Sequence, residues 1–228
     1  RRGEASDIHG CKPNARRALT RLRGVRRAGS RHRGRVAGED LLGVDQAVEP
    51  SGLLYSKPTD IYALTAKQLV DGKIVAWFQG GAEFGPRALG NRSILAKPFP
   101  VAMKDHINER VKFREYFRPF AGAILEEFCH DYCEISQPSP HMLIACQIRE
   151  DKREEIPAVV HVDDSCRIQT VSAQNNPRFR KMIEAFYALT GTPVVLNTSF
   201  NVKGQPIVNK PKEAIETFLS TNIDCLII

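Results

Sequence analysis

The strongest constraint on the fold is the alternation along the chain of helical patterns with apolar runs of strand length. Residues 177–190 start with a proline, which suits the first position of a helix, and stop before Gly191, which suits a helix end. One face of this segment carries Phe179, Met182, Ile183, Phe186 and Leu189. The next residues, 193–196, form an apolar run that predicts a buried strand. A chain that repeats this alternation forms an α/β domain.

The same pattern recurs on both sides of this unit. Thr59 and Asp60 are suited to cap a helix that ends at Asp71-Gly72. Further helices are predicted at 102–111 and 211–219, and strands at 73–78, 141–148, 168–171 and 225–228, with a strand or mixed structure at 119–127. The organised part of the chain is therefore predicted to run from residue 45 to residue 228, which is long enough for one large core.

The basic charge of the chain is confined to its first residues. Residues 1–36 hold eleven arginines and one lysine against two acidic residues, whereas the rest of the chain has a net charge of −3. This segment has no aromatic residue and no sustained apolar period, so residues 1–44 are predicted to be a disordered basic tail. The same composition is typical of GC-rich DNA read out of frame or upstream of the true start. A phosphate-binding arm is a third hypothesis, although it lacks the aromatic residues that stack on bases.

The chain is expected to be cytoplasmic. No apolar run reaches the roughly 18 residues that cross a bilayer, and charged residues stand where a signal peptide would be apolar. The six cysteines include no CxxC pair, which favours reduced thiols. Cys129-His130-x-x-Cys133 could reach a metal ion, but it lacks a second ligand pair of matching spacing. We therefore expect packing at a helix end there and predict no metal site.

Three polar segments are candidates for chemistry. The first, residues 78–95, reads FQGGAEFGPRALGNRSIL. Its glycines let backbone N–H groups approach a ligand, and Arg87 and Arg92 offer bidentate donors to phosphate or carboxylate. The segment matches neither the Walker P-loop nor the dinucleotide fingerprint. A structural turn with surface arginines explains the same residues equally well.

The second segment, residues 112–120, alternates cations with aromatic residues. A strand here would place Lys112, Arg114 and Arg118 on one face and the aromatic side chains of Phe113 and Phe117 on the other. The cationic face would then line a site, or it would simply be solvated.

The third segment, residues 196–208, is a predicted polar loop after a buried strand. It contains Asn197, Ser199 and Asn201, followed by Lys203. Ligands bind beyond such strand ends in open α/β sheets. Ordinary turn residues account for the same composition.

Four blocks of this sequence resemble, in this order, the carbamoyltransferase C-terminal domain of nodulation and antibiotic-tailoring O-carbamoyltransferases. The blocks are FQGGAEFGPRALGNRSIL, KFREYFRPFA, PAVVHVDDSCRIQTV and PVVLNTSFNVKGQPIV. The resemblance covers about residues 45–228. It implies a YrdC-like α/β fold with a twisted mixed sheet, flanking helices and a basic cavity. It also implies that the domain forms carbamoyl-adenylate from ATP and carbamoyl phosphate, with Mg²⁺ accompanying the ATP.

The resemblance also implies a partner domain. In complete family members an N-terminal domain of the actin-like ATPase fold, which holds an iron ion with His and Asp ligands, transfers the carbamoyl group to an acceptor hydroxyl. This chain has no room for that domain, so Fe²⁺ would belong to the partner alone. Neither a membrane nor a nucleic acid is an expected partner.

Carried over position by position, the resemblance assigns roles to residues of the four blocks. Lys112, Arg118 and Arg87 would act on the reacting phosphates. The substrate and nucleotide would be bound by Arg92, Arg114, Arg167, Asn197, Ser199, Asn201, Lys203 and His161, with Asp163 beside the last of these. Lys203 and Gly81 stand where the family often has arginine. Lysine keeps the charge of arginine but loses its bidentate fork.

Other functions fit the same sequence. The chain is alternatively an inactive truncated remnant of such an enzyme, or an RNA-binding YrdC-like module. An adjacent reading frame that encodes the N-terminal half would favour the enzyme. Loss of RNA binding after deletion of residues 1–40 would assign such binding to the charge of the tail. A Cys-His hydrolase built on Cys129 and His130 is disfavoured, because sequence neighbours seldom hold a nucleophile and a base within reach of each other.

Overall fold

The computed structural model describes residues 35–37, 51 and 53–228. Nearly all of the predicted basic tail lies outside these residues. Arg35–Ala37 is the exception, because it forms a strand in which Val36 and Ala37 are buried. The predicted tail therefore contains one short strand, and the apolar side chains of Val36 and Ala37 join the core.

Helices and strands alternate along the described residues, as predicted. The strands are β1 (Arg35–Ala37), β2 (Leu54–Ser56), β3 (Val75–Phe78), β4 (Arg92–Ala96), β5 (Ala121–Leu125), β6 (Cys133–Glu134), β7 (Ala145–Ile148), β8 (Ser165–Val171), β9 (Val194–Ser199) and β10 (Cys225–Ile227). The α-helices are α3 (Ile61–Val70), α4 (Ala102–Ile107), α5 (Cys129–Tyr132), α6 (Pro177–Thr190) and α7 (Pro211–Leu219). Shorter helical turns are the π-helix η2 (Asn108–Lys112) and the 3₁₀ helices η3 (Glu126–Phe128) and η4 (Glu150–Lys152).

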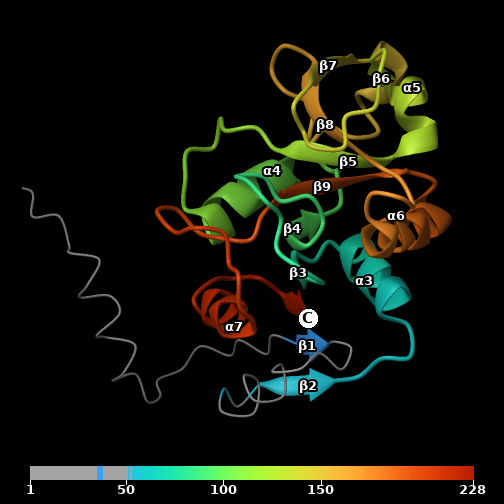
Figure 1. The fold of residues 1–228 in the computed structure, drawn as a ribbon. Coiled ribbons are helices and arrows are strands. Elements are labelled where there is room, and N and C mark those ends of the chain that lie inside the picture. Colours follow the sequence, from blue (N-terminus) through green and yellow to red (C-terminus); the bar gives the residue numbers. More distant parts are fainter. Residues whose placement is uncertain (1–34, 38–50, 52) are drawn as a thin grey trace, which may run out of the picture. The chain divides into compact units, whose positions relative to one another are not determined.

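The strands form one mixed sheet in the order β2-β1-β10-β3-β4-β9-β5-β8-β7-β6, which Figure 1 shows from bottom to top. The pairs β2–β1, β1–β10, β10–β3 and β5–β8 are parallel. The other pairs are antiparallel. The predicted mixed α/β sheet is thus confirmed.

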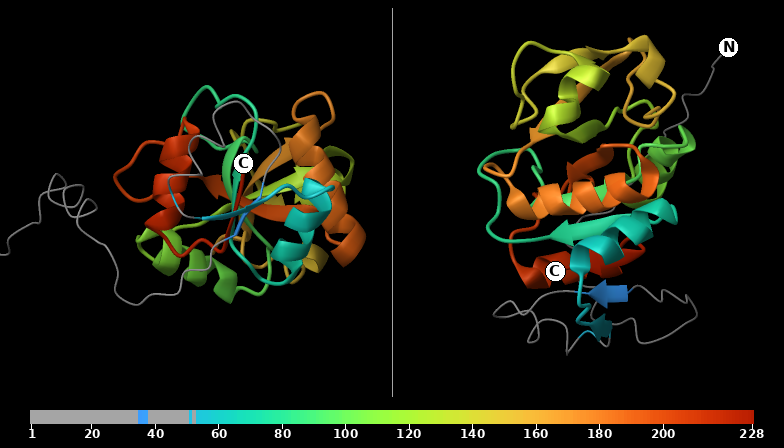
Figure 2. Two further views of the ribbon diagram at one scale, coloured as in Figure 1. Left: turned by 90° about the horizontal axis from the view of Figure 1, so that it is seen from below. Right: turned by 90° about the vertical axis from the view of Figure 1, so that its right-hand side faces the viewer.

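Both faces of the sheet are buried. Because side chains alternate between the faces of a strand, Val75 and Trp77 of β3 join one hydrophobic cluster, whereas Ala76 and Phe78 join the other. The first cluster contains the buried faces of α3 and α6, which lie side by side (Figures 1 and 2). The second contains the buried faces of α4 and α7.

Helix α6 begins and ends where the sequence predicted. The side chain of Asn176 accepts a hydrogen bond from the backbone N–H of Phe179, and Gly191 takes the left-handed conformation just after the last helical residue. Four of the five predicted core residues are buried. The exception is Leu189, which is 59% exposed because the buried face of the helix ends one turn earlier, at Phe186.

The prediction of a strand at residues 112–120 is wrong. Lys112 ends η2, and Phe113 takes a left-handed conformation with φ of 47°. The side chain of Asn108 then donates hydrogen bonds to the backbone carbonyls of Tyr116 and Arg118, so the segment folds back on η2 instead of pairing with a strand. Phe117, which a strand would have buried, is 65% exposed.

Two strands extend into residues that were predicted to be loops. β9 continues through Asn197 to Ser199. Asn197 pairs with both β4 and β5, whereas Thr198 and Ser199 pair with β4. β4 begins inside the first glycine-rich block, at Arg92. Pairing with neighbouring strands stabilises the extended backbone at these residues, whose polar side chains favour turns.

Candidate active site

Five strand ends meet at one edge of the sheet, which we call the loop edge. β3 and β9 end there, and β4, β5 and β8 begin there, as their paired residues show. The segments connected to these ends are 79–91, 113–120, 156–164 and 200–210. Each of the four sequence blocks contributes one of them, so the topology brings the four blocks together.

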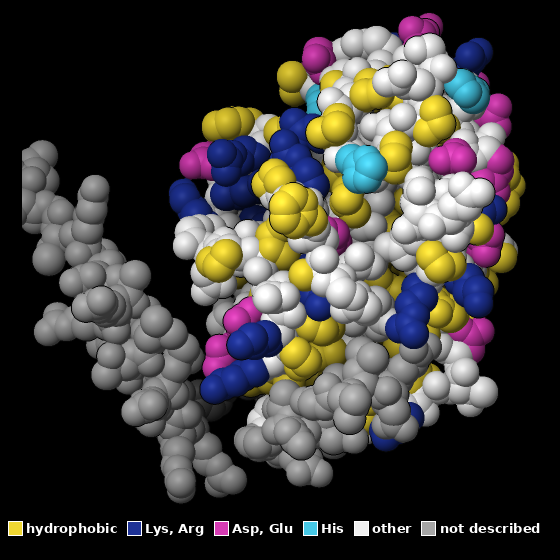
Figure 3. Space-filling view, in the orientation of Figure 1, with side chains coloured by type: hydrophobic (Ala, Val, Ile, Leu, Met, Phe, Trp, Pro, Cys, Tyr) yellow, Lys and Arg dark blue, Asp and Glu magenta, His cyan; other side chains and the backbone are white. Residues whose placement is uncertain are grey.

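Lysine and arginine side chains gather over the region of α4 and the segment after η2 (Figure 3). Lys112 is the cation of this region that is most deeply inserted, with 4% of its surface exposed. Its Nζ donates to the backbone O and Oγ of Ser199 and to the backbone O and Oδ1 of Asn201. These acceptors are all uncharged. Burial, and to a lesser degree the neighbouring Arg114, lower the pKa of Lys112 to about 7.

Arg114 lies on the same segment, over the ring of Phe120 at 4.6 Å from its centroid. Its Nε donates to Asn108 Oδ1 at 2.7 Å. Burial and the nearby Arg118 lower the pKa of this guanidinium. Asn108 therefore positions the segment through both its amide nitrogen and its amide oxygen.

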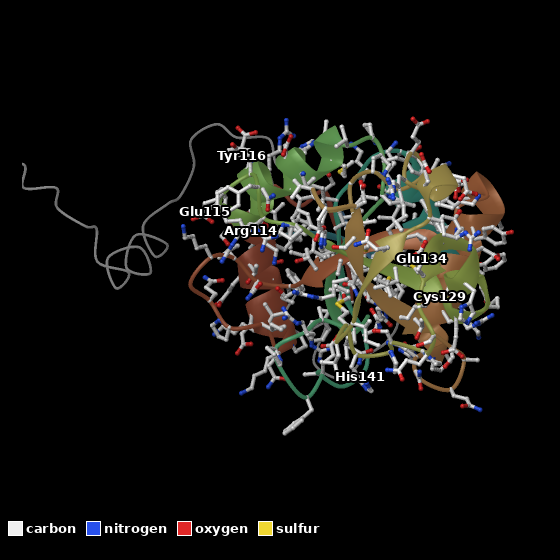
Figure 4. The ribbon with its side chains drawn as sticks, turned by 90° about the horizontal axis from the view of Figure 1, so that it is seen from above. Arg114, Glu115, Tyr116, Cys129, Glu134 and His141 are labelled. Carbon is white, nitrogen blue, oxygen red and sulfur yellow. The ribbon has the colours of Figure 1, made fainter. Side chains whose placement is uncertain are left out.

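Glu115 forms ion pairs with Arg118 on its own segment and with Lys203 on the segment after β9. Glu115 lies 3.7 Å from Arg118 Nε and 3.5 Å from Lys203 Nζ, measured between the charged atoms. Figure 4 shows Arg114, Glu115 and Tyr116 together on their loop. All three members of this ion-pair group are about half exposed, so the group costs little to open.

His161 and Arg167 form the third part of the loop edge. His161 Nε2 lies 3.2 Å from the carbonyl oxygen of Phe120, and Nδ1 lies 3.2 Å from Ser165 Oγ. Ser165 Oγ donates to Asp163 Oδ1 at 2.7 Å. Burial is the main cause that lowers the pKa of His161, and Arg167 is near enough to lower it further.

Glu83 organises the glycine-rich segment at its base. One oxygen, Oε1, accepts hydrogen bonds from the backbone N–H groups of Leu89, Asn91 and Arg92 at 2.7, 2.8 and 3.1 Å. The loop tip, which includes Arg87, is exposed. Glu83 thus supports the tip without being part of it.

Arg92 is buried behind the same loop. Its terminal nitrogens donate to the carbonyls of Gln79, Asn91, Gly80 and Asn209 at 3.0–3.3 Å, and its guanidinium stacks 3.5 Å from the centroid of Phe78. Burial lowers the pKa of Arg92. This geometry supports a role in joining residues 79–91 to the segment after β9.

Asn197 is likewise buried and supports the loop from below. Its Nδ2 donates to the carbonyl of Ala88 at 3.2 Å and to Gln169 Oε1 at 2.9 Å. Gln169 donates in turn to the carbonyl of Leu89 at 2.9 Å. The loop is therefore held through its backbone carbonyls by side chains of β8 and β9.

An open cleft of about 540 Å³ lies between the glycine-rich segment and the segment after β9. It is lined by Ala82, Glu83, Gly85, Pro86, Asn201, Pro206, Ile207, Val208 and Asn209. Its volume is in the range of small-molecule sites. Asn201 lines the cleft and also binds Lys112, so the buried lysine lies directly behind the cleft wall.

The structure thus separates the predicted site residues by position. Lys112, Ser199 and Asn201 form one hydrogen-bonded group, Arg118 is linked to Lys203 through Glu115, and His161 lies beside Arg167. Arg92 and Asn197 support the loop, and Arg87 lies on its exposed tip.

The sequence alone did not single out Glu83, Asn108, Gln169 or Ser165. Each is an ordinary polar residue whose partners lie in another turn or strand. The one available signal was Gln169, a polar residue that follows Ile168 in a predicted strand.

The segment Cys129–Cys133 lies on α5 and β6, apart from the loop around Arg114 (Figure 4). Cys129 is buried and His130 is exposed, in keeping with a packing role at a helix end. Within the described stretches, no three His, Cys, Asp or Glu side chains are arranged to hold a metal ion. None of the helices that the structure describes combines the length and apolar character needed to span a bilayer.

The fold is that of YrdC and Sua5-like proteins. The chain superposes on full-length HypF, solved in a phosphate- and nucleotide-bound form, with a TM-score of 0.52 and 22% identity, covering 75% of this chain and 25% of HypF. It superposes on P. abyssi Sua5, solved with L-threonine, with a TM-score of 0.51 and 17% identity, covering 73% and 46% of the two chains.

The chain belongs to the carbamoyltransferase C-terminus family, whose profile matches residues 66–228. The nodulation protein NolNO of Sinorhizobium fredii is 43% identical over 196 residues, which cover 82% of this chain and 29% of NolNO. The chain spans about a third of the length of its first curated relatives. The family assignment is confirmed, while the predicted domain boundary at residue 45 stays a prediction.

Proposed function

We propose that residues 45–228 are the activation half of an O-carbamoyltransferase. This half binds ATP and carbamoyl phosphate at the loop edge and forms carbamoyl-adenylate. A separate domain of the actin-like ATPase fold, with its own Fe²⁺, passes the carbamoyl group to an acceptor hydroxyl. Family membership and the 43% identity to a nodulation protein support carbamoyl transfer as the overall reaction.

The observation that carries the proposal is the position of Lys112. A buried ammonium group whose partners are neutral oxygens lies behind a nucleotide-sized cleft, with Arg118, Lys203 and Arg167 around the same edge. An anionic ligand beside Lys112 would supply the charge that its protein partners do not. Fixed cations of this kind stabilise the charge that develops on phosphate oxygens during adenylation.

The proposed reaction has two steps, hydrolysis of carbamoyl phosphate and displacement of pyrophosphate from ATP. Carbamoyl phosphate and water give carbamate and phosphate, and a carbamate oxygen then attacks the α-phosphorus of ATP as pyrophosphate leaves. Neither step needs a nucleophile from the protein, so the residues of the loop edge act by binding, orientation and charge. Mg²⁺ would enter on the phosphates of ATP, where it keeps most of its water ligands.

The test is pyrophosphate and carbamoyl-adenylate formation by the purified chain, with ATP, with or without carbamoyl phosphate. Arg118→Ala is expected to lower the rate by about 100-fold, since one fixed cation near a reacting phosphate contributes on this scale. Arg110→Ala is the matched control, because Arg110 is an exposed cation nearby that faces His106 instead. Equal rates in the two variants would refute the assignment of Arg118.

Absence of product from the folded chain leads to a second arm, in which the N-terminal half of a relative is supplied in trans. Recovery of activity there would identify a half that works only with its partner. Continued inactivity with both halves folded and associated would favour the truncated remnant.

A further inference from the structure

Asn108, the first residue of η2, is a buried polar residue with 1% of its surface exposed. Its backbone carbonyl accepts hydrogen bonds from the N–H groups of Phe113 and Arg114. Its side-chain Nδ2 donates to the carbonyls of Tyr116 and Arg118 at 3.2 Å each, and its Oδ1 accepts from Arg114 Nε at 2.7 Å. One residue thus makes five hydrogen bonds to the segment after η2.

The shape of this segment depends on these hydrogen bonds. Among the residues that the structure describes, it pairs with no strand, and Phe113, Tyr116 and Phe117 are 51–74% exposed, so packing does not fix it. The left-handed conformation of Phe113 is uncommon for a bulky residue and persists where surrounding contacts enforce it. The carbonyl of Asn108 supplies this constraint, because it accepts the N–H groups of Phe113 and of the next residue.

Asn108 also connects two cations of the loop edge. Lys112 ends η2, which is anchored in the core by the fully buried side chain of Val111. Arg118 lies on the exposed segment, and its backbone carbonyl is bound by Asn108 Nδ2. The amide of Asn108 therefore sets where the backbone of Arg118 lies relative to Lys112.

We propose that Asn108 is a positioning residue for adenylation, which holds the backbone of Arg118 at a fixed place relative to the ammonium group of Lys112. The inference rests on the proposed function, since it takes both cations to serve the reacting phosphates. Asn108 is not among the residues that line the cleft, so it acts through Arg118 and not on a ligand. Stabilisation by fixed cations depends on their position, and a displacement of about 1 Å can lower a rate by about 100-fold.

The chemistry of the side chain suggests a substitution that separates these contacts. Asparagine offers two N–H donors and one carbonyl acceptor on a short side chain. Aspartate has nearly the same size and keeps an acceptor for Arg114 Nε, but it has no N–H for the carbonyls of Tyr116 and Arg118. Asn108→Asp is therefore expected to release Arg118 while it leaves Arg114 bound.

The experiment is a double-mutant cycle on carbamoyl-adenylate formation by the full chain, with the N-terminal half of a relative supplied if the wild type needs it. Asn108→Asp should lower kcat/KM for carbamoyl phosphate by about 10- to 100-fold. Because Asn108 acts through Arg118, the double variant should be within about threefold of Arg118→Ala alone. If the two losses multiply instead, Asn108 does not act through Arg118 and the inference is overturned. Asn175→Asp, which adds the same charge at an exposed position before α6, should keep the wild-type rate.

Hydrogen exchange of the wild-type chain, read by mass spectrometry, gives a second test that needs neither activity nor a folded variant. The amide hydrogens of Phe113 and Arg114 should exchange slowly although the segment is exposed, and at least about tenfold faster in Asn108→Asp. Unprotected amides in the wild type would overturn the inference and leave the proposed function standing. A wild-type chain that protects these amides but makes no adenylate, even with both halves present, would refute the proposed function and the role of Asn108 in it.

Discussion

The buried amine of Lys112 makes a sharp prediction about pH, which the substitution Lys112→Met isolates. Methionine has a similar length and does not titrate. The unfolded chain keeps the proton of this lysine up to a pKa of about 10.5, whereas the folded chain releases it at about 7. Between these values the unfolded state binds more protons. The free energy of unfolding of the wild type therefore rises with pH in this window.

The size of the effect follows from the same two values. Each pH unit inside the window contributes about 1.4 kcal/mol. Because Lys112 is only half titrated at pH 7, the gain from pH 7 to pH 9 is about 2 kcal/mol. Other titrating groups are present in both proteins, so they largely cancel when the variant is subtracted from the wild type.

The assay is urea unfolding of both proteins at pH 7 and pH 9 with unchanged ionic strength. The stability difference, wild type minus Lys112→Met, should become about 2 kcal/mol more favourable at pH 9. Pyrophosphate should reduce this change if it binds beside Nζ, because an anion favours the charged amine. Parallel pH profiles, with a change below about 0.5 kcal/mol, would refute the claim that Lys112 is desolvated.

Five further substitutions, at four positions, test the support of the glycine-rich segment, each by its effect on the free energy of unfolding in urea. Gly90→Ala should lower the free energy of unfolding by at least about 3 kcal/mol, because Gly90 has φ of 99° and a Cβ there would lie 2.2 Å from Phe179 Cδ1. Gly81→Ala is the control, since a Cβ there meets open space and the substitution should lower stability by less than about 1 kcal/mol. Equal losses in the two variants would contradict this account. Glu83→Gln should lower the free energy of unfolding by about 1–2 kcal/mol, because it removes the charge from the acceptor of three hydrogen bonds. Glu83→Ala should lower it further, since the acceptor is lost. A Gln variant as stable as the wild type would show that the charge is unimportant. Asn197→Ala should cost about 1–3 kcal/mol, because the carbonyl of Ala88 and Gln169 Oε1 lose their shared donor, and a neutral result would mean that water replaces it.

Much of the fold could be predicted from local sequence. The limits of α6 follow from Asn176, Pro177 and Gly191, whose cap and turn preferences act within a few residues. The buried strands β3 and β10 follow from apolar runs flanked by turn residues. Interactions of this range are encoded where they act, so a pattern along the chain is sufficient to find them.

The candidate site could be predicted only in part. The four blocks carry the family resemblance and contain Lys112 and Arg118, because cations and glycines are recognisable at any position. The pattern at 112–120 misled, since the hydrogen bonds of Asn108 override the alternation that favours a strand. The sequence also did not show that Arg92 supports the loop whereas Lys112 lies behind the cleft, because both residues are cations within the family blocks.

By itself, the sequence determined the α/β class, the family and the set of cations available for phosphate chemistry. Tertiary structure alone decided where each cation lies: Lys112 behind the cleft wall, Arg92 bound to the backbone carbonyls that hold the loop, and Arg87 on the exposed loop tip. Lys112 meets the turn at Ser199–Asn201 across 87 residues or more, and Arg92 reaches Asn209 across 117. Burial and hydrogen-bond partners over such separations depend on the sheet order β3-β4-β9-β5-β8, which no local pattern specifies.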